Sequence, residues 1–303
     1  MIDTLEKHLG KGRIKHEFSL APLSTFKIGG PAEYYFEAES DEDLLNAVKA
    51  AHELSIPIII LGGISNVVVG KKGIRGLVVK NMNSYKRVVD DQQDHVILRV
   101  GSGYSMSRLA RETAQEGYAG LEYHFGLPGT VGGGIAMNSG WYAHKPDKYI
   151  GDPLVQAMLV TSDGSSKIVD HDYFNFAYDY SIIKETHECI VWAEFKLEKQ
   201  PAEELLNNTQ TAIDHRKRTQ PFGIPTSGCF FQNVNGESAG KIIDEAGLKG
   251  FAIGGAEVSK LHANFIINTG DATSDDVEKL IQHVKDRVKE SHNIELHEEI
   301  VRL

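Results

Sequence analysis

Cysteine is scarce in this chain: Cys189 and Cys229 are the two cysteines among 303 residues. Two cysteines are too few for the disulfide framework of a small secreted domain or for a zinc site made of cysteines alone. Long apolar runs are also missing. The longest candidate, residues 56–69, is interrupted by proline, glycine and asparagine, and it is shorter than the ~18 residues that cross a membrane. We therefore expect neither a disulfide-stapled protein nor a membrane protein.

Basic residues are in the minority, with Lys+Arg at 32 against Asp+Glu at 42, for a formal net charge of −10. A non-specific nucleic-acid binder needs a basic surface, so we expect no nucleic-acid partner. Residues 1–7 contain no apolar signal core, which predicts a protein of the cytoplasm. Glycine is the residue in excess, at 30 of 303, against a usual share of ~7%.

The hydrophobic pattern alternates between helical and extended spacing, which predicts a mixed α+β fold. Ser40 precedes three acidic residues and an apolar stripe, so we expect it to cap a helix over residues 41–54. Pro201 and the charged residues around it predict a domain boundary, with one domain over 1–200 and another over 201–303. The other expected helices are 106–116, 202–218, 239–246 and one that begins at 273 or 274; the expected strands are 58–61, 96–100, 190–195, 264–268 and 294–300.

Residues 61–66 (LGGISN) form the first glycine segment, between two apolar runs. Glycine tolerates positive φ and lets a backbone approach a ligand closely, and successive N–H groups in such a turn can bind an anion. Ser65 and Asn66 add side-chain donors. A pyrophosphate suits this turn, and a tight hairpin without a ligand is the alternative.

Residues 126–134 (GLPGTVGGG) hold five glycines in nine residues. The segment lacks the Lys-Ser or Lys-Thr that closes a P-loop, and its glycine spacing differs from that of the dinucleotide fingerprint. The small residues that follow, 135–140, suit packing against a flat ring. Two such segments in one chain favour a cofactor site over a glycine-rich crossover without a ligand.

Several motifs in one order resemble a known family. Residues 24–32 (STFKIGGPA), 61–66 and 121–140 are similar to the opening motif, the glycine turn and the central flavin segment of the UDP-N-acetylenolpyruvoylglucosamine reductases. The similar stretches in the last third are 246–250, 254–256 and 258–268 (VSKLHANFIIN). The resemblance runs from about residue 20 to residue 303, and the combination is specific although each piece alone is not.

The resemblance implies an FAD-binding domain of the vanillyl-alcohol-oxidase (PCMH) type in two subdomains, about 20–80 and 81–200, followed by an α+β substrate domain. The length matches the shorter type of the family, which lacks an inserted substrate-gating loop. Family members bind FAD without a covalent bond, take hydride from NADPH and reduce the enolpyruvyl group of a nucleotide sugar to a lactyl ether. The product, UDP-N-acetylmuramate, serves peptidoglycan synthesis and so cell-wall biogenesis, cell shape and cell division. We expect a monomer. We expect no metal, because no histidine spacing fits a zinc site.

The resemblance also implies which residues hold FAD. They come from the opening motif, the glycine turn and the central segment. The implied cofactor-binding residues are Lys27, Gly29, Leu61, Gly62, Gly63, Ile64, Ser65, Asn66, Gly126, Pro128, Gly129, Thr130, Gly132, Gly133, Ala136, Asn138 and Gly140.

The family's proton donor lies in a G-S-x-F-K-N segment, and residues 228–233 (GCFFQN) match it with Cys229 in place of the serine. A thiol has an ordinary pKa of about 8.5, so it is mostly protonated at neutral pH and is a better acid than an alcohol. Because a thiolate could not donate a proton, we predict that the site keeps this thiol protonated. The alternative for Cys229 is a small buried hydrophobic residue.

The second catalytic group implied is Glu299, in residues 296–300 (LHEEI), which match the family ending L-E-P-E-V. Glu299 would orient the substrate or stabilise the developing intermediate. In a terminal strand, Glu295, His297 and Glu299 would share one face, and the apolar residues would share the other. A solvated terminal glutamate is the alternative.

The third catalytic position departs from the family. Residues 176–181 (FAYDYS) match F-x-Y-R-x-S, and Asp179 stands where the arginine should be. An aspartate that faces a substrate carboxylate would repel it unless the aspartate is protonated. Gln232 likewise replaces a lysine, so a second positive charge is missing. The candidates for a compensating cation are Lys184, Lys27 and Arg216.

The implied substrate contacts are Tyr178, Lys184, Arg216, Gln232, Asn233 and His262. Arg216 lies in residues 216–221 (RKRTQP), which match the family's R-K-x-T-Q-P and suit the diphosphate of UDP. The alternative for this cluster is a solvated helix end that answers the helix dipole. The alternative for His262 is a packed histidine.

Asp179 and Gln232 leave two other functions open. One is a flavin oxidoreductase of the same fold with another substrate. The other is a non-catalytic relative that binds flavin or a nucleotide sugar.

Overall fold

The structure is a computed structural model that describes residues 1–143 and 146–303. The chain divides into two compact units that interleave in sequence. The first unit comprises Met1–His16, Tyr34–Gly63 and Arg75–His215. The second unit comprises Glu17–Glu33, Ile64–Ile74 and Arg216–Leu303. This division differs from the predicted bounds at residue 200, and those bounds stay a prediction.

A four-stranded sheet forms early in the chain, in the order β1-β2-β5-β3. Its strands are β1 (Lys15–Ser19), β2 (Pro31–Ala38), β3 (Ile58–Leu61) and β5 (Ile74–Asn81). In the first unit, α1 (Ile2–Leu9) and α2 (Asp41–Glu53) bury Leu5 and Leu44 in one core with Leu77 of β5. The Ser40 hydroxyl accepts from the backbone N–H of Asp43 at 3.1 Å and begins α2 as predicted.

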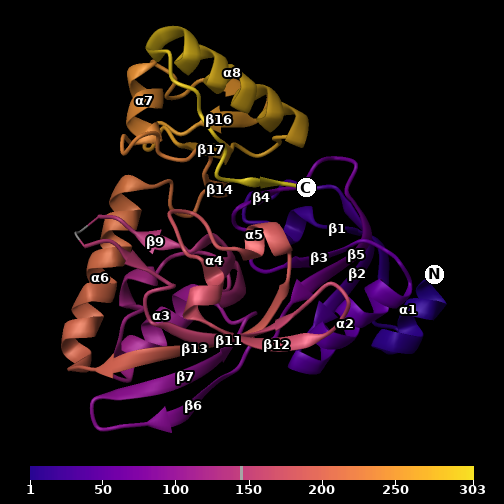
Figure 1. Ribbon diagram of the computed structural model, residues 1–303. Helices are drawn as coiled ribbons and strands as arrows, with labels where there is room; N and C mark the ends of the chain where they lie inside the picture. The colour runs from indigo at the N-terminus through magenta and orange to yellow at the C-terminus, as the bar shows by residue number, and fades with distance from the viewer. Residues whose placement is uncertain (144–145) are drawn as a thin grey trace. The chain divides into compact units, whose positions relative to one another are not determined.

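The larger sheet of the first unit is antiparallel and has the order β12-β11-β13-β7-β6, with β8 paired to β13. Its strands are β6 (Lys86–Asp91), β7 (His95–Gly101), β8 (Tyr118–Ala119), β11 (Leu154–Val160), β12 (Ser166–Asp170) and β13 (Cys189–Lys199). The hairpin of β6 and β7 is drawn in purple in Figure 1. The helices α3 (Met106–Gln115) and α4 (Val131–Met137) share a buried core with this sheet.

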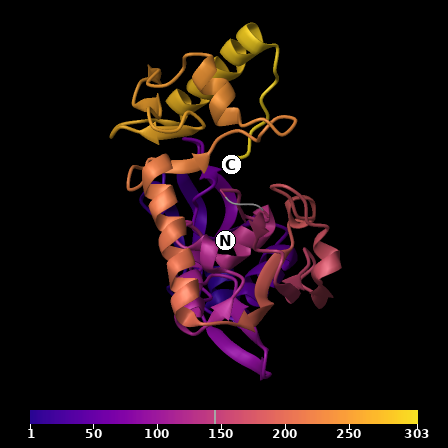
Figure 2. The same cartoon turned by 90° about the vertical axis from the view of Figure 1, so that its left-hand side faces the viewer.

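Shorter elements complete the first unit. The two-residue strands β9 (Gly140–Trp141) and β10 (Lys148–Tyr149) pair with each other, and α5 (Ile183–Thr186) is a single turn. The long helix α6 (Ala202–Thr219) runs from the first unit into the second, and Figure 2 shows it in orange along its whole length.

The second unit is built around a four-stranded sheet in the order β14-β17-β16-β15. Its elements are β14 (Thr226–Cys229), α7 (Ala239–Glu245), β15 (Ala252–Ile253), β16 (Ala256–Val258), β17 (Phe265–Asn268) and α8 (Ser274–His292). Helices α7 and α8 lie side by side in Figures 1 and 2 and bury Ile243 and Val277 in one core. The last strand, β18 (Val301–Arg302), pairs in parallel with β4 (Val67–Val68).

One expected strand is wrong. Residues 294–300 were expected to form a terminal strand, but the strand at this end is β18, which begins at Val301. The preceding residues make single backbone contacts instead: Gln232 N–H donates to the His297 carbonyl at 2.9 Å, and Phe231 bridges to Glu298. The expected alternation still holds in part, because Leu296 and Ile300 are buried while Glu295 and His297 are exposed.

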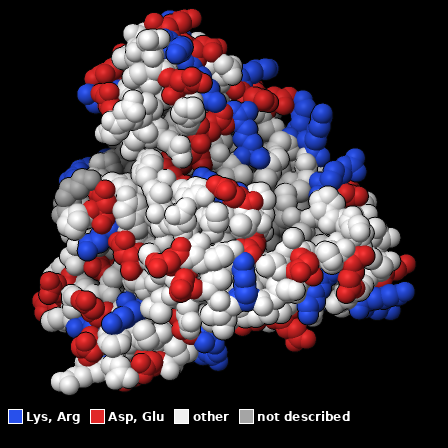
Figure 3. All heavy atoms as spheres, in the orientation of Figure 1, with Lys and Arg blue, Asp and Glu red and all other residues white. Residues whose placement is uncertain are grey.

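Acidic and basic side chains are intermingled over the face of the molecule drawn in Figure 3. Among the described residues, no helix combines the length and apolar composition that a membrane span requires.

Candidate active site

The structure divides the predicted site residues between the two units. The first unit holds Leu61, Gly62, Gly63, Gly126, Pro128, Gly129, Thr130, Gly132, Gly133, Ala136, Asn138, Gly140, Tyr178, Asp179 and Lys184. The second unit holds Lys27, Gly29, Ile64, Ser65, Asn66, Arg216, Cys229, Gln232, Asn233, His262 and Glu299. Each group forms its own arrangement.

The two glycine segments of the sequence meet in the first unit. A Cβ on Gly63 would lie 2.5 Å from the Cα of Gly129, and a Cβ on Gly62 would collide with the hydroxyl of Thr130. At Gly63 the obstacle is backbone, which cannot move aside as a side chain can. Glycine at these two positions is therefore required for the close approach of the two segments.

Thr130 begins α4, the short helix that carries the glycine run. Its hydroxyl accepts from the Gly133 N–H at 3.4 Å. The backbone N–H of Val131 donates to Tyr104 O at 2.9 Å, and that of Gly132 donates to Ser102 O at 2.8 Å. These two donors are used within the protein, so at these positions the run is not an anion-binding turn. The sequence did not predict this helix, because glycine is a poor helix former.

Gly133 differs from its neighbours in α4. It is exposed, and the nearest atom to a Cβ built on it is the Thr130 hydroxyl at 3.5 Å, an ordinary contact. Packing within the unit therefore does not explain glycine at this position. An open backbone surface at Gly133 fits close approach by a flat ligand, as the predicted FAD site requires.

Four predicted site residues other than glycine have left-handed backbone: Lys27 at φ 61°, Ile64 at φ 50°, Asn138 at φ 45° and Asp179 at φ 50°. Asparagine adopts this conformation readily, whereas a β-branched residue such as isoleucine does so at a cost of order 1–3 kcal/mol. The Ile64 carbonyl accepts from the backbone N–H of Thr25 at 3.2 Å, and this bond helps to hold the strained turn. Such strain is typical of ligand-binding segments.

Asn138 ends α4 and uses its side chain within the first unit. Its amide Nδ2 donates to Ala177 O at 3.0 Å, and its Oδ1 accepts from Gly151 N–H at 3.3 Å. Both ends of the amide therefore fix the backbone on either side. Its predicted cofactor contact stays a prediction.

Cys229 ends β14 in the second unit and pairs with Phe265 of β17. The register shifts between Thr226 and Cys229, and the residue before the cysteine, Gly228, has φ 81°. This irregularity changes the direction of the strand at its end. The Cys229 side chain is half-buried, which differs from the fully buried state of Cys189. Burial raises the pKa of the Cys189 thiol to about 12 and keeps it neutral.

Arg216 is 5% exposed, so it is not part of a solvated helix end. Burial lowers the pKa of its guanidinium to about 10, and the charge of an ionised Cys229 acts in the opposite direction. The two side chains therefore lie within electrostatic range inside the second unit. The neighbouring Lys217 and Arg218 are exposed, so the basic cluster of the sequence separates into a buried member and two exposed ones.

Glu299 is connected to the Cys229 segment through the backbone. Its N–H donates to the carbonyl of Phe230, the residue after Cys229, at 2.9 Å. Its own carbonyl accepts from Asn66 Nδ2 at 3.2 Å. Glu299 is half-buried, which disfavours the solvated glutamate that the sequence left open. Thus Asn66, Cys229 and Glu299 belong to one hydrogen-bonded region of the second unit.

Asp179 is 6% exposed in the first unit, and its Oδ2 atom has no hydrogen-bond partner among the described residues. Burial raises the pKa of its carboxyl group, while hydrogen bonds from Tyr178 and Tyr142 and the charge of Lys184 act to lower it. The Lys184 ammonium donates to the backbone carbonyl of Asp179 at 3.0 Å. Of the three cations considered as replacements, Lys184 is the one that the first unit places beside Asp179.

Two further predicted residues of the second unit, Lys27 from the cofactor set and His262 from the substrate set, have different surroundings. Lys27 is exposed, and its ammonium donates to Pro22 O at 2.8 Å. His262 packs its ring edge-on to Phe265 at 4.9 Å, and burial lowers its pKa. Its contacts fit the packed histidine of the alternative, and a substrate role stays a prediction.

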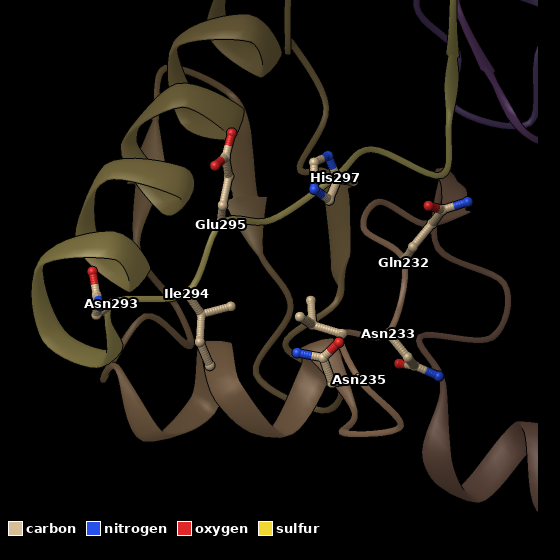
Figure 4. A pocket seen from close by; sticks show the side chains of 8 residues that line it. Gln232, Asn233, Asn235, Asn293, Ile294, Glu295 and His297 are labelled. Carbon is tan, nitrogen blue, oxygen red and sulfur yellow. The ribbon is translucent and has the colours of Figure 1, made fainter.

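Gln232 and Asn233 line a groove of about 440 Å³ in the second unit. Figure 4 shows this groove between the turn that carries Asn235 and the segment that carries Ile294. The Asn233 Oδ1 accepts from Ala239 N–H at 3.1 Å, which fixes its amide at the start of α7. Amide side chains that line an open groove suit hydroxyl and amide groups of a ligand.

Comparison with known proteins gives the order of domains that the sequence motifs predicted, an FAD-binding domain followed by a C-terminal domain. A family model described as the C-terminal domain of UDP-N-acetylenolpyruvoylglucosamine reductase matches residues 220–303, and an FAD binding domain model matches residues 32–170. UDP-N-acetylenolpyruvoylglucosamine reductase of Halalkalibacterium halodurans is 36% identical over 294 residues, which cover 95% of this chain and 94% of that protein. The enzyme of the same name from Chlamydia pneumoniae is 38% identical over 287 residues, 95% of this chain and 91% of that protein.

The chain belongs to the UDP-N-acetylenolpyruvoylglucosamine reductase family. The crystal structure of the reductase from Thermus caldophilus superposes with a TM-score of 0.81 at 30% identity, covering 96% of this chain and 98% of that one. The predicted family and fold class, an FAD domain of the PCMH type and an α+β C-terminal domain, are confirmed. The chain is an FAD-dependent oxidoreductase, and FAD as its cofactor is confirmed.

Two residues that contact the predicted site residues were missed from the sequence. Tyr142 hydrogen-bonds to Asp179 from a distant segment, and no local pattern indicates that contact. Lys80 lies in β5 with its ammonium on the carbonyl of Gly62. A signal for Lys80 was present, since it is a lone lysine in the apolar run 77–80 (LVVK) next to the glycine turn in space.

Proposed function

We propose that the chain reduces UDP-N-acetylenolpyruvoylglucosamine to UDP-N-acetylmuramate with NADPH as hydride donor, through FAD. The reaction supplies a precursor for peptidoglycan, and we place it in the cytoplasm, with the chain acting as a monomer. The observation that carries the proposal is the second unit's arrangement of Cys229, Arg216 and Glu299. These residues occupy the positions that the family motifs assign to the proton donor, a diphosphate contact and the second catalytic group.

The chemistry needs a hydride on one carbon of the enolpyruvyl double bond and a proton on the other. FAD, when bound, would carry the hydride from NADPH to the substrate. The Cys229 thiol would supply the proton from Sγ, leaving a thiolate that water reprotonates after each turnover. The buried Arg216 is the cation that stabilises this thiolate, because an opposite charge favours the ionised form.

Glu299 would act on the same substrate as Cys229, from the neighbouring segment of the hydrogen-bonded region. The Glu299 backbone N–H donates to the Phe230 carbonyl at 2.9 Å, and the Glu299 carbonyl accepts from Asn66 Nδ2 at 3.2 Å. These two bonds hold the backbone from which the Glu299 side chain extends close to the Cys229 segment. A carboxyl group placed in this way can orient the substrate or, in its protonated form, donate a hydrogen bond to the negative charge that develops when hydride adds to the double bond.

The proposal is tested by turnover of the enolpyruvyl sugar nucleotide with NADPH, comparing wild type with Cys229→Ala and Cys229→Ser. Cys189→Ala is the matched control, since it removes the buried thiol of the first unit. We expect turnover to fall in both Cys229 variants, more in the alanine variant, and to persist in the control. Unchanged turnover in Cys229→Ala would remove the thiol from the mechanism.

A second candidate is a flavin reductase that acts on a different substrate. Asp179 favours it, because its buried carboxyl replaces the arginine of the family motif. The nearby cation, Lys184, donates its ammonium to the backbone carbonyl of Asp179. An Asp179→Arg variant separates the two. If the native substrate is the enolpyruvyl sugar nucleotide and the pocket has adapted to Asp179, the arginine lowers turnover. If turnover of that substrate appears only in the arginine variant, the second candidate is supported.

A further inference from the structure

Lys80 is a charged residue inside a buried strand. It belongs to β5, in parallel register with β3, where it stands opposite Leu61. Its neighbours in the strand, Val78 and Val79, are fully buried. Burial lowers the pKa of the Lys80 ammonium, and the charge of Glu37 acts to raise it. A charge is retained in such surroundings only where polar partners compensate its loss of water.

The partner of the ammonium is the backbone carbonyl of Gly62 in the glycine turn. A peptide unit is planar and trans, so its C=O and N–H point in opposite directions. With the Gly62 oxygen held by Lys80, the N–H of Gly63 is turned away from Lys80. A hydrogen bond to the carbonyl also polarises the same peptide and strengthens its N–H as a donor.

The peptide is fixed from the glycine side as well. Gly62 contacts Thr130 and Gly63 contacts Gly129 so closely that neither position has room for a Cβ. The peptide between these two glycines therefore has little freedom to rotate, and the direction of its N–H is set by Lys80 and by the second glycine segment together. A preorganised donor of this kind binds an anion without the added entropy cost of ordering the donor itself.

We propose that Lys80 is a positioning residue for the diphosphate of FAD. It holds the Gly62–Gly63 peptide with its N–H directed to the bound diphosphate, and its ammonium adds a positive charge one peptide away from the anion. The inference rests on FAD binding to this turn, and it concerns the diphosphate rather than the flavin ring.

The test measures affinity for three ligands, FAD, ADP and riboflavin, on the full-length apoprotein. The variants are Lys80→Met, Lys80→Arg and the control Lys196→Met, which removes an exposed lysine from strand β13 of the same unit. Flavin binding is followed by fluorescence and ADP binding by calorimetry, and thermal unfolding of each apoprotein is recorded in parallel.

We expect Lys80→Met to weaken FAD and ADP binding by at least about tenfold, the size of one charge-assisted hydrogen bond, and to leave riboflavin binding unchanged. Lys80→Arg should recover part of the loss. Equal weakening of all three ligands, or unchanged FAD affinity, would overturn the proposal and leave Lys80 with a purely structural role. If Lys80→Met does not fold, Lys80→Gln gives the same comparison. Failure of the wild type to bind FAD at all would instead contradict the proposed function.

Discussion

Arg216 is buried in the second unit, within electrostatic range of Cys229. A buried arginine loses its hydration, and a counter-charge offsets part of that loss. The pairing therefore favours a mechanism in which the thiol gives up its proton during turnover and the resulting thiolate is stabilised by the guanidinium.

Removal of the thiol should slow proton transfer without loss of the cofactor. In Cys229→Ala we expect kcat to fall by roughly 100-fold or more, as is typical for loss of a general acid. The amount of bound FAD should equal that of wild type, because the variant leaves the glycine segments intact. Steady-state kinetics and the flavin absorbance of the purified protein check both outcomes. A variant that loses FAD together with activity would point to a structural role for Cys229.

Loss of the Arg216 charge should make Cys229 less reactive. In Arg216→Gln the thiolate has no buried counter-charge, so we expect alkylation of Cys229 by iodoacetamide at neutral pH to slow by several-fold. Mass spectrometry of the modified peptide over time measures the rate. Lys217→Gln is the control, since Lys217 is exposed one residue along α6. Equal rates in wild type and Arg216→Gln would show that the two groups are not coupled.

Alanine substitutions at Gly63 and Gly133 should have different effects, one on packing within the first unit and the other on FAD binding. Gly63→Ala places a Cβ against the backbone of Gly129, so we expect the free energy of unfolding of the apoprotein to fall by about 1–3 kcal/mol. Gly133→Ala meets only an ordinary contact and sits in a helix, so it should leave the apoprotein as stable or slightly more so. The same Gly133→Ala variant should bind FAD more weakly.

Urea denaturation of both apoproteins and a flavin titration test this contrast. Two results would contradict it: a stable Gly63→Ala protein, or a Gly133→Ala protein with wild-type FAD affinity. The second result would mean that the open surface at Gly133 does not receive the cofactor.

Asp179 should make stability depend on pH. Burial raises the pKa of its carboxyl in the folded state, so the folded chain keeps a proton that the unfolded chain releases. The cost of burying the charged carboxylate is absent below the ordinary pKa of an aspartate, so stability is highest there and falls as pH rises through the raised folded pKa. In Asp179→Asn this fall should be absent, and the protein should be more stable than wild type at neutral pH.

Denaturation at a series of pH values measures this slope. Asp172→Asn, which changes an exposed aspartate of the same unit, is the control. An unchanged slope in Asp179→Asn would mean that Tyr142, Tyr178 and Lys184 already hold the carboxylate in its charged form.

Local signals in the sequence predicted much of the secondary structure. The cap at Ser40 and the entry of α8 at Thr273 depend on residues within one helical turn. In contrast, the expected strand over 294–300 was wrong, because its pairing depends on the bulged Cys229 segment far away in sequence. Strands β2 and β5 carried no clear alternation and were not predicted.

Sequence motifs identified the residues of the candidate site. They did not predict the contacts that these residues make with one another. The sequence marks Gly62 and Gly129 as special but cannot show that their segments touch. It left Arg216 as either a solvated or a functional residue, and only the folded chain shows it buried within electrostatic range of Cys229. A lone lysine in an apolar run marked Lys80 in the sequence, but its partner is a backbone carbonyl, which the sequence could not identify.

The most direct test of the proposed reaction is anaerobic mixing of the FAD-loaded protein with NADPH and then with UDP-N-acetylenolpyruvoylglucosamine. The account predicts that flavin absorbance falls with NADPH and returns when the sugar nucleotide is added, with one lactyl ether formed for each NADPH consumed. Loss of flavin absorbance with NADPH and no return with the sugar nucleotide would contradict it.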